Sequence, residues 1–154
     1  MSTNADDMYF RAWVLARQAS YATSRAADIE LNKLGTSLAE IQILYVLKHY
    51  RGPMTPSTLS HLLVRRPNSV SGILIRMERR GLLRRLRDQQ DQRVVIVEIT
   101  NKGESVFNQR MYTPVISRIM SNLSEEELLQ FSKVTQVIYE AAIRELRRQK
   151  ARSK

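Results

Sequence analysis

Seven apolar residues near the beginning of the chain follow one another in alternating steps of four and three positions. They are Met8, Ala12, Leu15, Ala19, Ala22, Ala26 and Ile29. This spacing is the heptad repeat of a helix whose apolar seam packs against another helix. It predicts a helix over about residues 6–34, ended by Gly35 as the residue after the C-cap. The seam is rich in alanine, which lets another helix approach closely, and one small domain does not cover it.

Capping signals place three shorter helices after Gly35. A Ser-x-x-Glu capping box at Ser37 begins a mostly buried helix that runs to about residue 50. Thr55 followed by Pro56 is typical of an N-cap and a first helical residue, and predicts a short helix. Pro67 begins the next helix, which Gly81 ends. Its apolar stripe has the spacing i, i+3, i+4, i+7 and consists of Val70, Ile73, Leu74 and Met77.

Two short strands joined by a polar loop come next. We expect the first over about residues 82–87 and the second, rich in β-branched residues, over about residues 92–99. Thr100 then caps a helix to about residue 121, which Pro114 should kink. A second capping box at Ser124 begins a last helix to about residue 148, followed by a fraying basic tail. This order predicts a mainly α fold with a small β-hairpin wing: a winged helix-turn-helix flanked by long helices.

The charge of the chain indicates a polyanionic partner. There are 25 Lys and Arg residues against 15 Asp and Glu, a formal net charge of +10. Nine arginines, three acidic residues and no lysine lie between Leu59 and Arg93. Arginine makes planar, bidentate contacts to phosphate and guanine that lysine does not make. A solvated charged face is the alternative, but such faces normally mix signs and favour lysine with glutamate.

The residue types that are missing exclude several kinds of site. The chain has no cysteine, which excludes disulfides, iron–sulfur clusters and thiol redox sensing. Its two histidines are too few for a histidine-rich metal site. We find no phosphate-binding loop and no nucleophile–base motif, so we expect neither an enzyme nor a cofactor. We also find no signal peptide and no apolar run of transmembrane length, so we expect a cytoplasmic protein without a membrane partner.

The helix predicted over about residues 67–80 has small polar groups on the face opposite its apolar stripe. Small side chains permit close approach to DNA, asparagine pairs with adenine, and arginine reaches guanine or phosphate. This face therefore suits a helix that enters the major groove. Capping of the helix start is an equally weighted alternative for the asparagine and the serines. The candidate residues are Asn68, Ser69, Ser71, Gly72 and Arg76.

Arginines on either side of this helix are further candidate DNA contacts. Arg65 and Arg66 immediately precede it, and Arg87 and Arg93 flank the hairpin loop. An arginine at the tip of a wing can enter a narrow minor groove. Alternatively, the hairpin arginines Arg84, Arg85, Arg87 and Arg93 belong to a salt-bridged strand surface. In that surface the loop aspartates could pair with Arg87 and Arg93 and hold the wing. The aspartates are Asp88 and Asp91.

Two segments resemble the MarR family of winged helix-turn-helix regulators. Asp91-x-Arg93, an apolar strand and then Ile99-Thr100-x-x-Gly103 look like the wing signature of that family. Upstream, Ser69-Val70-Ser71, then Leu74, Met77-Glu78 and Gly81-Leu82 are similar to its recognition helix. The chain departs from the family at Gly72, where a polar residue is common, and at Pro67. Base specificity therefore does not transfer.

The resemblance implies a homodimeric transcription regulator, by expectation a repressor, that binds a pseudo-palindromic stretch of double-stranded DNA. Residues 53–100 would form the DNA-binding region, and residues 1–52 and 101–154 the helical dimerisation region of one compact domain. Many members release DNA when a small, often phenolic ligand binds between these regions. Residues that would line such a site are Trp13, Arg17, Tyr21, Tyr45, His49 and Tyr112. Packing and cation–π contact within the dimer is the favoured explanation for them.

Two other functions compete with sequence-specific regulation. The net charge fits an architectural DNA-binding protein without sequence preference equally well, and only the ratio of specific to non-specific affinity separates the two. A winged-helix adaptor that binds proteins is disfavoured by the arginines on the face that would meet the groove.

Overall fold

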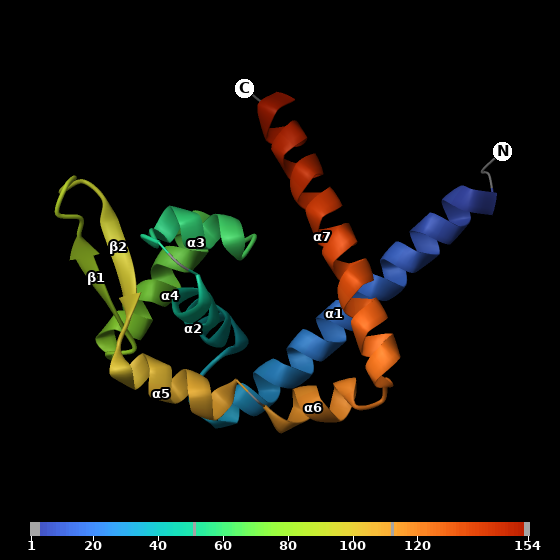
Figure 1. The fold of residues 1–154 in the computed structure, drawn as a ribbon, viewed down its shortest axis with the longest axis horizontal. Helices are drawn as coiled ribbons and strands as arrows, with labels where there is room; N and C mark the ends of the chain where they lie inside the picture. The colour runs from blue at the N-terminus through green and yellow to red at the C-terminus, as the bar shows by residue number, and fades with distance from the viewer. Residues whose placement is uncertain (1–3, 51, 112, 153–154) are drawn as a thin grey trace. The chain divides into compact units, whose positions relative to one another are not determined.

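The computed structural model describes residues 4–50, 52–111 and 113–152. The chain divides into two units, Met1–Ile116 and Ser117–Lys154, and each is described by itself. α6 (Pro114–Met120) crosses the boundary between the units, and α7 (Glu125–Arg152) belongs to the second. The first unit contains, in chain order (Figure 1), α1 (Asn4–Lys33), α2 (Leu38–His49), α3 (Pro56–Leu62), α4 (Pro67–Arg79), β1 (Leu83–Arg87), β2 (Val95–Ile99) and α5 (Asn101–Arg110). The predicted class, mainly α with one β-hairpin, is confirmed.

The turn between α1 and α2 has the predicted capping residues. Gly35 has a φ of +72°, and the N–H of Thr36 donates to the carbonyl of Leu31 at 3.1 Å. Ser37 Oγ accepts the N–H of Glu40, and the Glu40 carboxylate accepts the N–H of Ser37, so the capping box is complete. The two helices therefore meet at a turn fixed by local hydrogen bonds.

The core of the first unit lies around α2, which contacts α1, α4, α5 and β2. α1 contributes through its C-terminal end, where Ala27 and Leu31 are buried. Most of the preceding helix, including the heptad seam, is exposed, and Figure 1 shows it extending beyond the other elements of this unit. The largest fully buried side chains are Phe107, Leu31, Ile43, Leu44, Leu59, Leu74, Met77, Leu82, Leu83 and Val70.

α3 and α4 form the predicted helix-turn-helix. Thr55 Oγ1 accepts the N–H of Thr58 at 3.1 Å, which caps α3, and proline begins each helix as predicted. Gly81, with a φ of +71°, follows the end of α4. The buried residues of α4 are the predicted stripe, Val70, Ile73, Leu74 and Met77. The opposite face of α4 is thereby presented to solvent.

β1 and β2 form an antiparallel hairpin that projects past α4 (Figure 1). The first strand agrees with the prediction to within one residue, but the second begins at Val95 and not at Gln92. The N–H of Asp88 donates to the carbonyl of Val94, and the N–H of Val94 donates to the carbonyl of Asp91, each at 2.9 Å. The loop is therefore longer than predicted, because its closing residues bond within the turn and not across the sheet.

α5 begins in close contact with the hairpin. Thr100 Oγ1 accepts the N–H of Gly103 at 3.1 Å and donates to the carbonyl of Gly81 at 2.7 Å. A Cβ built on Gly103 collides with the carbonyl oxygen of Leu82 and lies 2.9 Å from Ile99 Cγ1. Only glycine fits at this position of the Thr-x-x-Gly sequence, because the helix backbone touches the strand that leads into the wing.

The prediction of one kinked helix over residues 101–121 is wrong. α5 ends at Arg110, and α6 starts anew at Pro114. Proline lacks an N–H and disfavours helical geometry in the residue before it, so it begins a helix here where a kink was expected. Ile116 follows with its N–H bonded to the carbonyl of Thr113 at 3.0 Å.

In the second unit, α7 begins at the predicted capping box. The N–H of Ser124 donates to Glu127 Oε2 at 2.8 Å. This backbone hydrogen bond, with a second bond from the Ser124 hydroxyl, lowers the pKa of Glu127. The predicted fraying of the basic tail is wrong as far as Arg152, where α7 ends. An ion pair between Arg148 and Glu145 at 3.8 Å supports the last turns, and residues 153–154 lie outside the described residues.

Long apolar stretches of both units face solvent. On α1, Met8 and Leu15 of the heptad seam are exposed, Leu15 by 67%. On α7 an apolar face is also exposed, including Phe131, Val134 and Ile138. Within the described parts of the chain, no helix is both long and apolar enough to cross a membrane.

Candidate nucleic-acid interface

The first turns of α4 carry three exposed polar side chains that have no partner within the described residues. The side chains of Asn68, Ser69 and Ser71 make no hydrogen bond within these residues. The N-cap of α4 is Arg66, and no side chain caps the helix. The alternative that these residues cap the start of α4 is therefore wrong. Their donors and acceptors are free to bind an external partner, and the four N–H groups at a helix start favour a negatively charged one.

Gly72 leaves open space in the middle of this surface. A Cβ built on it would meet Arg76 Nη1 at 3.7 Å, an ordinary contact, and no closer atom. Nothing in the packing of the described residues requires glycine, although glycine costs about 1 kcal/mol of helix propensity against alanine. Gly72 therefore leaves room for a partner to approach the helix closely.

Four arginines surround the polar turns of α4. All are exposed, and Arg65 is held loosely by Gln42 Oε1 at 3.4 Å. Within the described residues, the guanidinium groups of the other three have no hydrogen bond or ion pair. The four are Arg65, Arg66, Arg76 and Arg79. The structure thus brings Arg65, Arg66 and Arg76 together with the polar residues of α4, as the sequence predicted, and it adds Arg79.

The strand arginines are bonded differently. Arg84 pairs with Glu98 across the hairpin at 2.7 Å, so for this residue the predicted salt-bridged strand surface is correct. Arg85 bonds Glu78 of α4 through Nε at 2.7 Å and through its own N–H at 3.0 Å. The side-chain hydrogen bond from Arg85 is the main reason that the pKa of Glu78 lies below its ordinary value of 4.5. α4 and the first wing strand are thereby joined.

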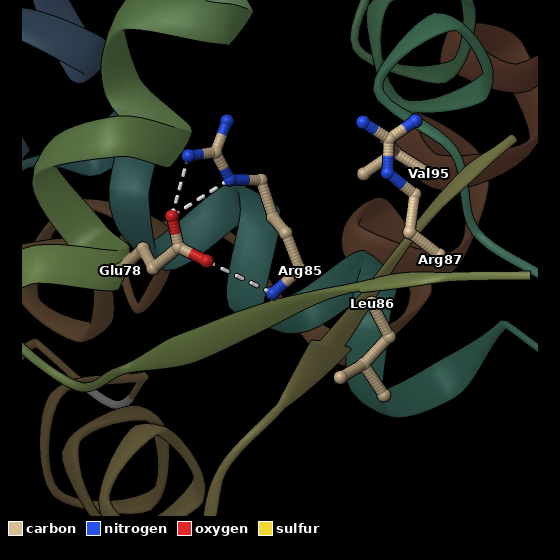
Figure 2. Close-up of a pocket in the computed structure, with 5 residues that line it drawn as sticks. All are labelled: Glu78, Arg85, Leu86, Arg87 and Val95. Carbon is tan, nitrogen blue, oxygen red and sulfur yellow. Dashed lines mark hydrogen bonds and ion pairs between the residues drawn. The ribbon is translucent and has the colours of Figure 1, made fainter. Parts of the chain in front are cut away.

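An open pocket of about 300 Å³ lies beside this joint, between α4 and the wing. Figure 2 shows Glu78 and Arg85 turned toward each other and the Arg87 guanidinium on the same side of β1, with Leu86 on the opposite side. Arg87 Nη1 donates to the carbonyl of Gln92 at 2.9 Å, which holds it against the loop. Val95 completes the lining. The pocket is too open to sequester a ligand, and its cationic groups extend the α4 surface onto the wing.

The wing tip is shaped by carboxylates that bond the backbone. Asp88 Oδ1 accepts the N–H groups of Gln90 and Asp91 at 2.7 and 3.0 Å. Asp91 Oδ1 accepts the N–H of Arg93 at 3.0 Å. Within the described residues neither aspartate forms an ion pair with Arg87 or Arg93, so that predicted pairing is wrong. In each aspartate Oδ1 accepts backbone N–H groups of the turn, as in an Asx turn, so the carboxylates stabilise the loop itself.

The five described residues among those proposed for a ligand site lie in two separate groups. Trp13, Arg17 and Tyr21 are exposed along α1, where Trp13 contacts Phe10 at 5.7 Å between ring centroids. Tyr45 and His49 stack on α2 at 4.4 Å. No ring contact, hydrogen bond or ion pair between described residues joins the two groups. Tyr112 lies outside the described residues.

Phe107 of α5 is a member of the α2 group that sequence reasoning missed. Its ring is 6.2 Å from Tyr45 and 5.7 Å from His49, edge-on to the latter. Lys48 Nζ lies 5.3 Å over the same ring. Phe107 is 62 positions from Tyr45 in the chain (107 − 45), and only the fold brings them together.

Comparison with known proteins finds relatives that are transcription regulators. A family model described as the MarR family matches residues 36–95. The chain is 27% identical over 114 residues to the HTH-type transcriptional repressor MdtR of Bacillus subtilis, covering 73% of both proteins. It is 30% identical over 112 residues to the HTH-type transcriptional regulator PecS of Dickeya dadantii, covering 70% of this chain and 68% of that protein.

Solved structures show the same fold. The organohalide-sensing transcriptional regulator RdhR, in its 2,4-dichlorophenol-bound form, has a TM-score of 0.74 and 28% identity over 88% of this chain and 82% of that one. The transcriptional regulator BldR of Sulfolobus solfataricus has a TM-score of 0.77 over 87% of this chain and 96% of that one, and at 23% identity it supports the fold alone.

Proposed function

This chain belongs to the MarR family of transcription regulators, which bind DNA and are not enzymes, and on that premise we propose that it is a homodimeric repressor of a pseudo-palindromic operator. The repressor role is supported by the similarity to MdtR, which is a repressor. The observation that carries the proposal is the solvent face of α4. Polar side chains without a described partner and an open glycine there are surrounded by arginines that form no ion pair within the described residues.

In this proposal α4 is the recognition helix. Asn68 pairs with adenine in the major groove, and Ser69 and Ser71 contact bases or phosphates at the N-terminal end of the helix. Gly72 lets the helix approach the base edges closely. Arg76 reaches guanine or a phosphate on one side, and phosphates on the other side are contacted by Arg65 and Arg66.

The wing supplies the second contact of each subunit. Arg93 stands at the tip with a guanidinium that no described residue holds, and we propose that it enters the minor groove. Asp88 and Asp91 shape the tip through the backbone, so they act on DNA binding indirectly. Arg87 lies behind the tip and faces the phosphates. Arg84 and Arg85 stay with their acidic partners.

Dimerisation accounts for the exposed apolar surface. We propose that residues 53–100 are the DNA-binding region and that residues 1–52 and 101–154 are the dimerisation region. The heptad seam of α1 and the apolar face of α7 are the surfaces that a second copy would cover. An interface of this kind buries on the order of 2,000 Å² or more.

Release by a small phenolic ligand is the least constrained element of the proposal. RdhR was solved with 2,4-dichlorophenol, and this chain has a cluster of aromatic rings between α2 and α5. Tyr45, 52% exposed, and His49 offer polar groups and stacked rings to a ligand at the surface of this cluster, next to the buried Phe107. Trp13, Arg17 and Tyr21 would belong to the site only where a second copy places them beside this cluster.

Selection of genomic fragments by the purified protein tests the main proposal. The selected duplex and a random duplex of equal length are titrated at one salt concentration. Sequence-specific regulators prefer their sites by typically about 10³–10⁷-fold. Equal affinity for the two duplexes would contradict the proposal and support an architectural DNA-binding function. The net charge of +10 alone is enough to explain that function.

A further inference from the structure

A buried carboxylate links the turn between α1 and α2 to the end of α4. The Glu40 side chain is only 8% exposed. Its two oxygens accept Arg80 Nη1 at 2.8 and 2.9 Å, and one of them also accepts Thr36 Oγ1 at 2.9 Å. Arg80 is the C-cap of α4 and follows Glu40 by 40 positions in the chain. The capping box supplies one donor to the Glu40 carboxylate, and the arginine is an additional, long-range partner.

Arg80 is held at several points. Its Nη2 donates to the carbonyl of Gly35 at 2.7 Å, beyond the end of α1. Lys102 Nζ donates to the backbone carbonyl of Arg80 at 2.7 Å from the first turn of α5. One residue at the end of α4 is thus bonded to α2, to the α1–α2 turn and to α5. The other end of α4 has no side-chain cap, so the side-chain hydrogen bonds that hold this helix, here and at the Glu78–Arg85 joint, lie toward its C-terminal end.

From this geometry we propose that Glu40 and Arg80 are positioning residues for DNA binding. The pair fixes the angle of α4 relative to the end of α1, the helix whose seam would pair the two subunits. The spacing and tilt of two recognition helices in a dimer then depend on the pair, although Glu40 is buried and touches no DNA. The inference rests on the proposed role of α4.

The sign of one substitution separates positioning from simple electrostatics. Glu40→Gln keeps the size and an acceptor for the N–H of Ser37 but weakens the hold on Arg80. Removing a negative charge and freeing an arginine should strengthen binding to a polyanion if charge alone acts. If the pair positions α4, affinity for the selected operator falls by about 2- to 30-fold, the range seen for coupling residues without ligand contact. Affinity for random duplex stays level or rises.

The matched control is Glu98→Gln on the wing. It also removes one negative charge and frees an arginine, Arg84, but the Arg84–Glu98 pair is exposed and joins only the two strands. We expect it to leave the ratio of specific to random affinity unchanged. An equal gain for both Glu→Gln variants would overturn the proposal, because charge would then explain both.

Reduced folding of the variants is handled by a double-mutant cycle. Glu40→Gln, Arg80→Gln and the double variant are compared for operator affinity, with circular dichroism and thermal unfolding on the same samples. The proposal expects the double variant to bind no worse than the weaker single variant. If Arg80 instead contacts phosphate directly, Arg80→Gln alone weakens binding, for operator and random duplex alike.

Asn68→Ala run in parallel tests α4 itself: if it changes nothing, the proposed function fails, and with it this inference. Loss with Asn68→Ala but not with Glu40→Gln overturns the positioning role alone.

Discussion

Asp91 Oδ1 accepts the backbone N–H of Arg93 at 3.0 Å, and no described residue bonds the Arg93 guanidinium. The aspartate therefore shapes the turn from which the arginine projects, and it does not neutralise the arginine. At the wing tip Asp91 stabilises the turn, and Arg93 supplies the positive charge. Each can be changed without removing the function of the other.

Arg93→Ala should weaken binding to all duplexes by similar factors. A minor-groove or phosphate contact contributes without reading the sequence, and its loss reduces the slope of log affinity against log salt by about one contact per subunit. A salt titration of operator and random duplex measures this. Unchanged affinity would mean that the arginine faces solvent in the complex.

The control at the wing tip is a pair of substitutions at position 91. Asp91→Asn keeps an oxygen that can accept the N–H of Arg93, whereas Asp91→Ala removes it. We expect near-normal binding for the asparagine variant and weakened binding for the alanine variant. Weak binding by both would show that the charge of Asp91 matters, contrary to the hydrogen bonds in the turn.

Two glycines should respond in opposite ways to alanine. Gly72→Ala should raise stability by about 0.5–1 kcal/mol, because the added Cβ meets only ordinary contact and helix propensity improves. It should weaken DNA binding where the helix approaches the bases. Gly103→Ala should lower stability by about 1–3 kcal/mol or more, because the Cβ collides with the Leu82 carbonyl. Thermal unfolding and DNA titration distinguish the two, and loss of stability in Gly72→Ala would contradict the open space at that position.

Leu15→Glu should separate the dimer. Leu15 is 67% exposed in the single chain, where a glutamate would cost little. In a helix–helix interface the same charge is buried without a partner, which is strongly unfavourable. Light scattering should give twice the monomer mass of 17.9 kDa for the native chain and the monomer mass for the variant. Leu86→Glu, on the exposed face of the wing, serves as the control and should leave the mass unchanged.

The Glu78–Arg85 joint should make stability depend on acid pH. The pKa of Glu78 is lowered in the folded state, chiefly by the Arg85 side-chain hydrogen bond, so its contribution is present above the ordinary value of 4.5 and is lost as the pH falls through the lowered pKa. Glu78→Gln should therefore flatten the change of unfolding temperature between about pH 7 and pH 3. The flattening is partial, because the Glu127 carboxyl, whose pKa is also lowered, remains. A pH profile identical to that of the native chain would contradict this prediction.

What the sequence predicts well is local in the chain. The caps at Ser37, Thr55 and Thr100 and the buried stripe of α4 depend on residues within one or two turns, and all are confirmed. The partners of the charged side chains are not local. Glu40 accepts hydrogen bonds from Arg80, and the loop aspartates accept backbone N–H groups. The pattern of charges in the sequence reveals neither partner. The aromatic cluster around Phe107 is likewise assembled only by the fold. Sequence spacing therefore does not reveal that the described residues proposed for a ligand site lie in two groups.

Two recognition helices related by a two-fold axis must enter successive major grooves on one side of the duplex. That places them about 34 Å apart, so the operator should be an inverted repeat with half-site centres about 10 bp apart. Because Asn68 is unbonded within the described residues and exposed in the first turn of α4, it should meet equivalent bases in the two half-sites. Asn68→Ala should then cost about 1–3 kcal/mol at one symmetric base-pair position and leave non-specific binding nearly constant. If the dimer makes about 6–10 phosphate contacts, affinity should also fall about 10³–10⁵-fold between 50 and 200 mM salt. Footprinting and a salt titration on the selected site measure both, and a protected region without a dyad would exclude this arrangement of the two helices.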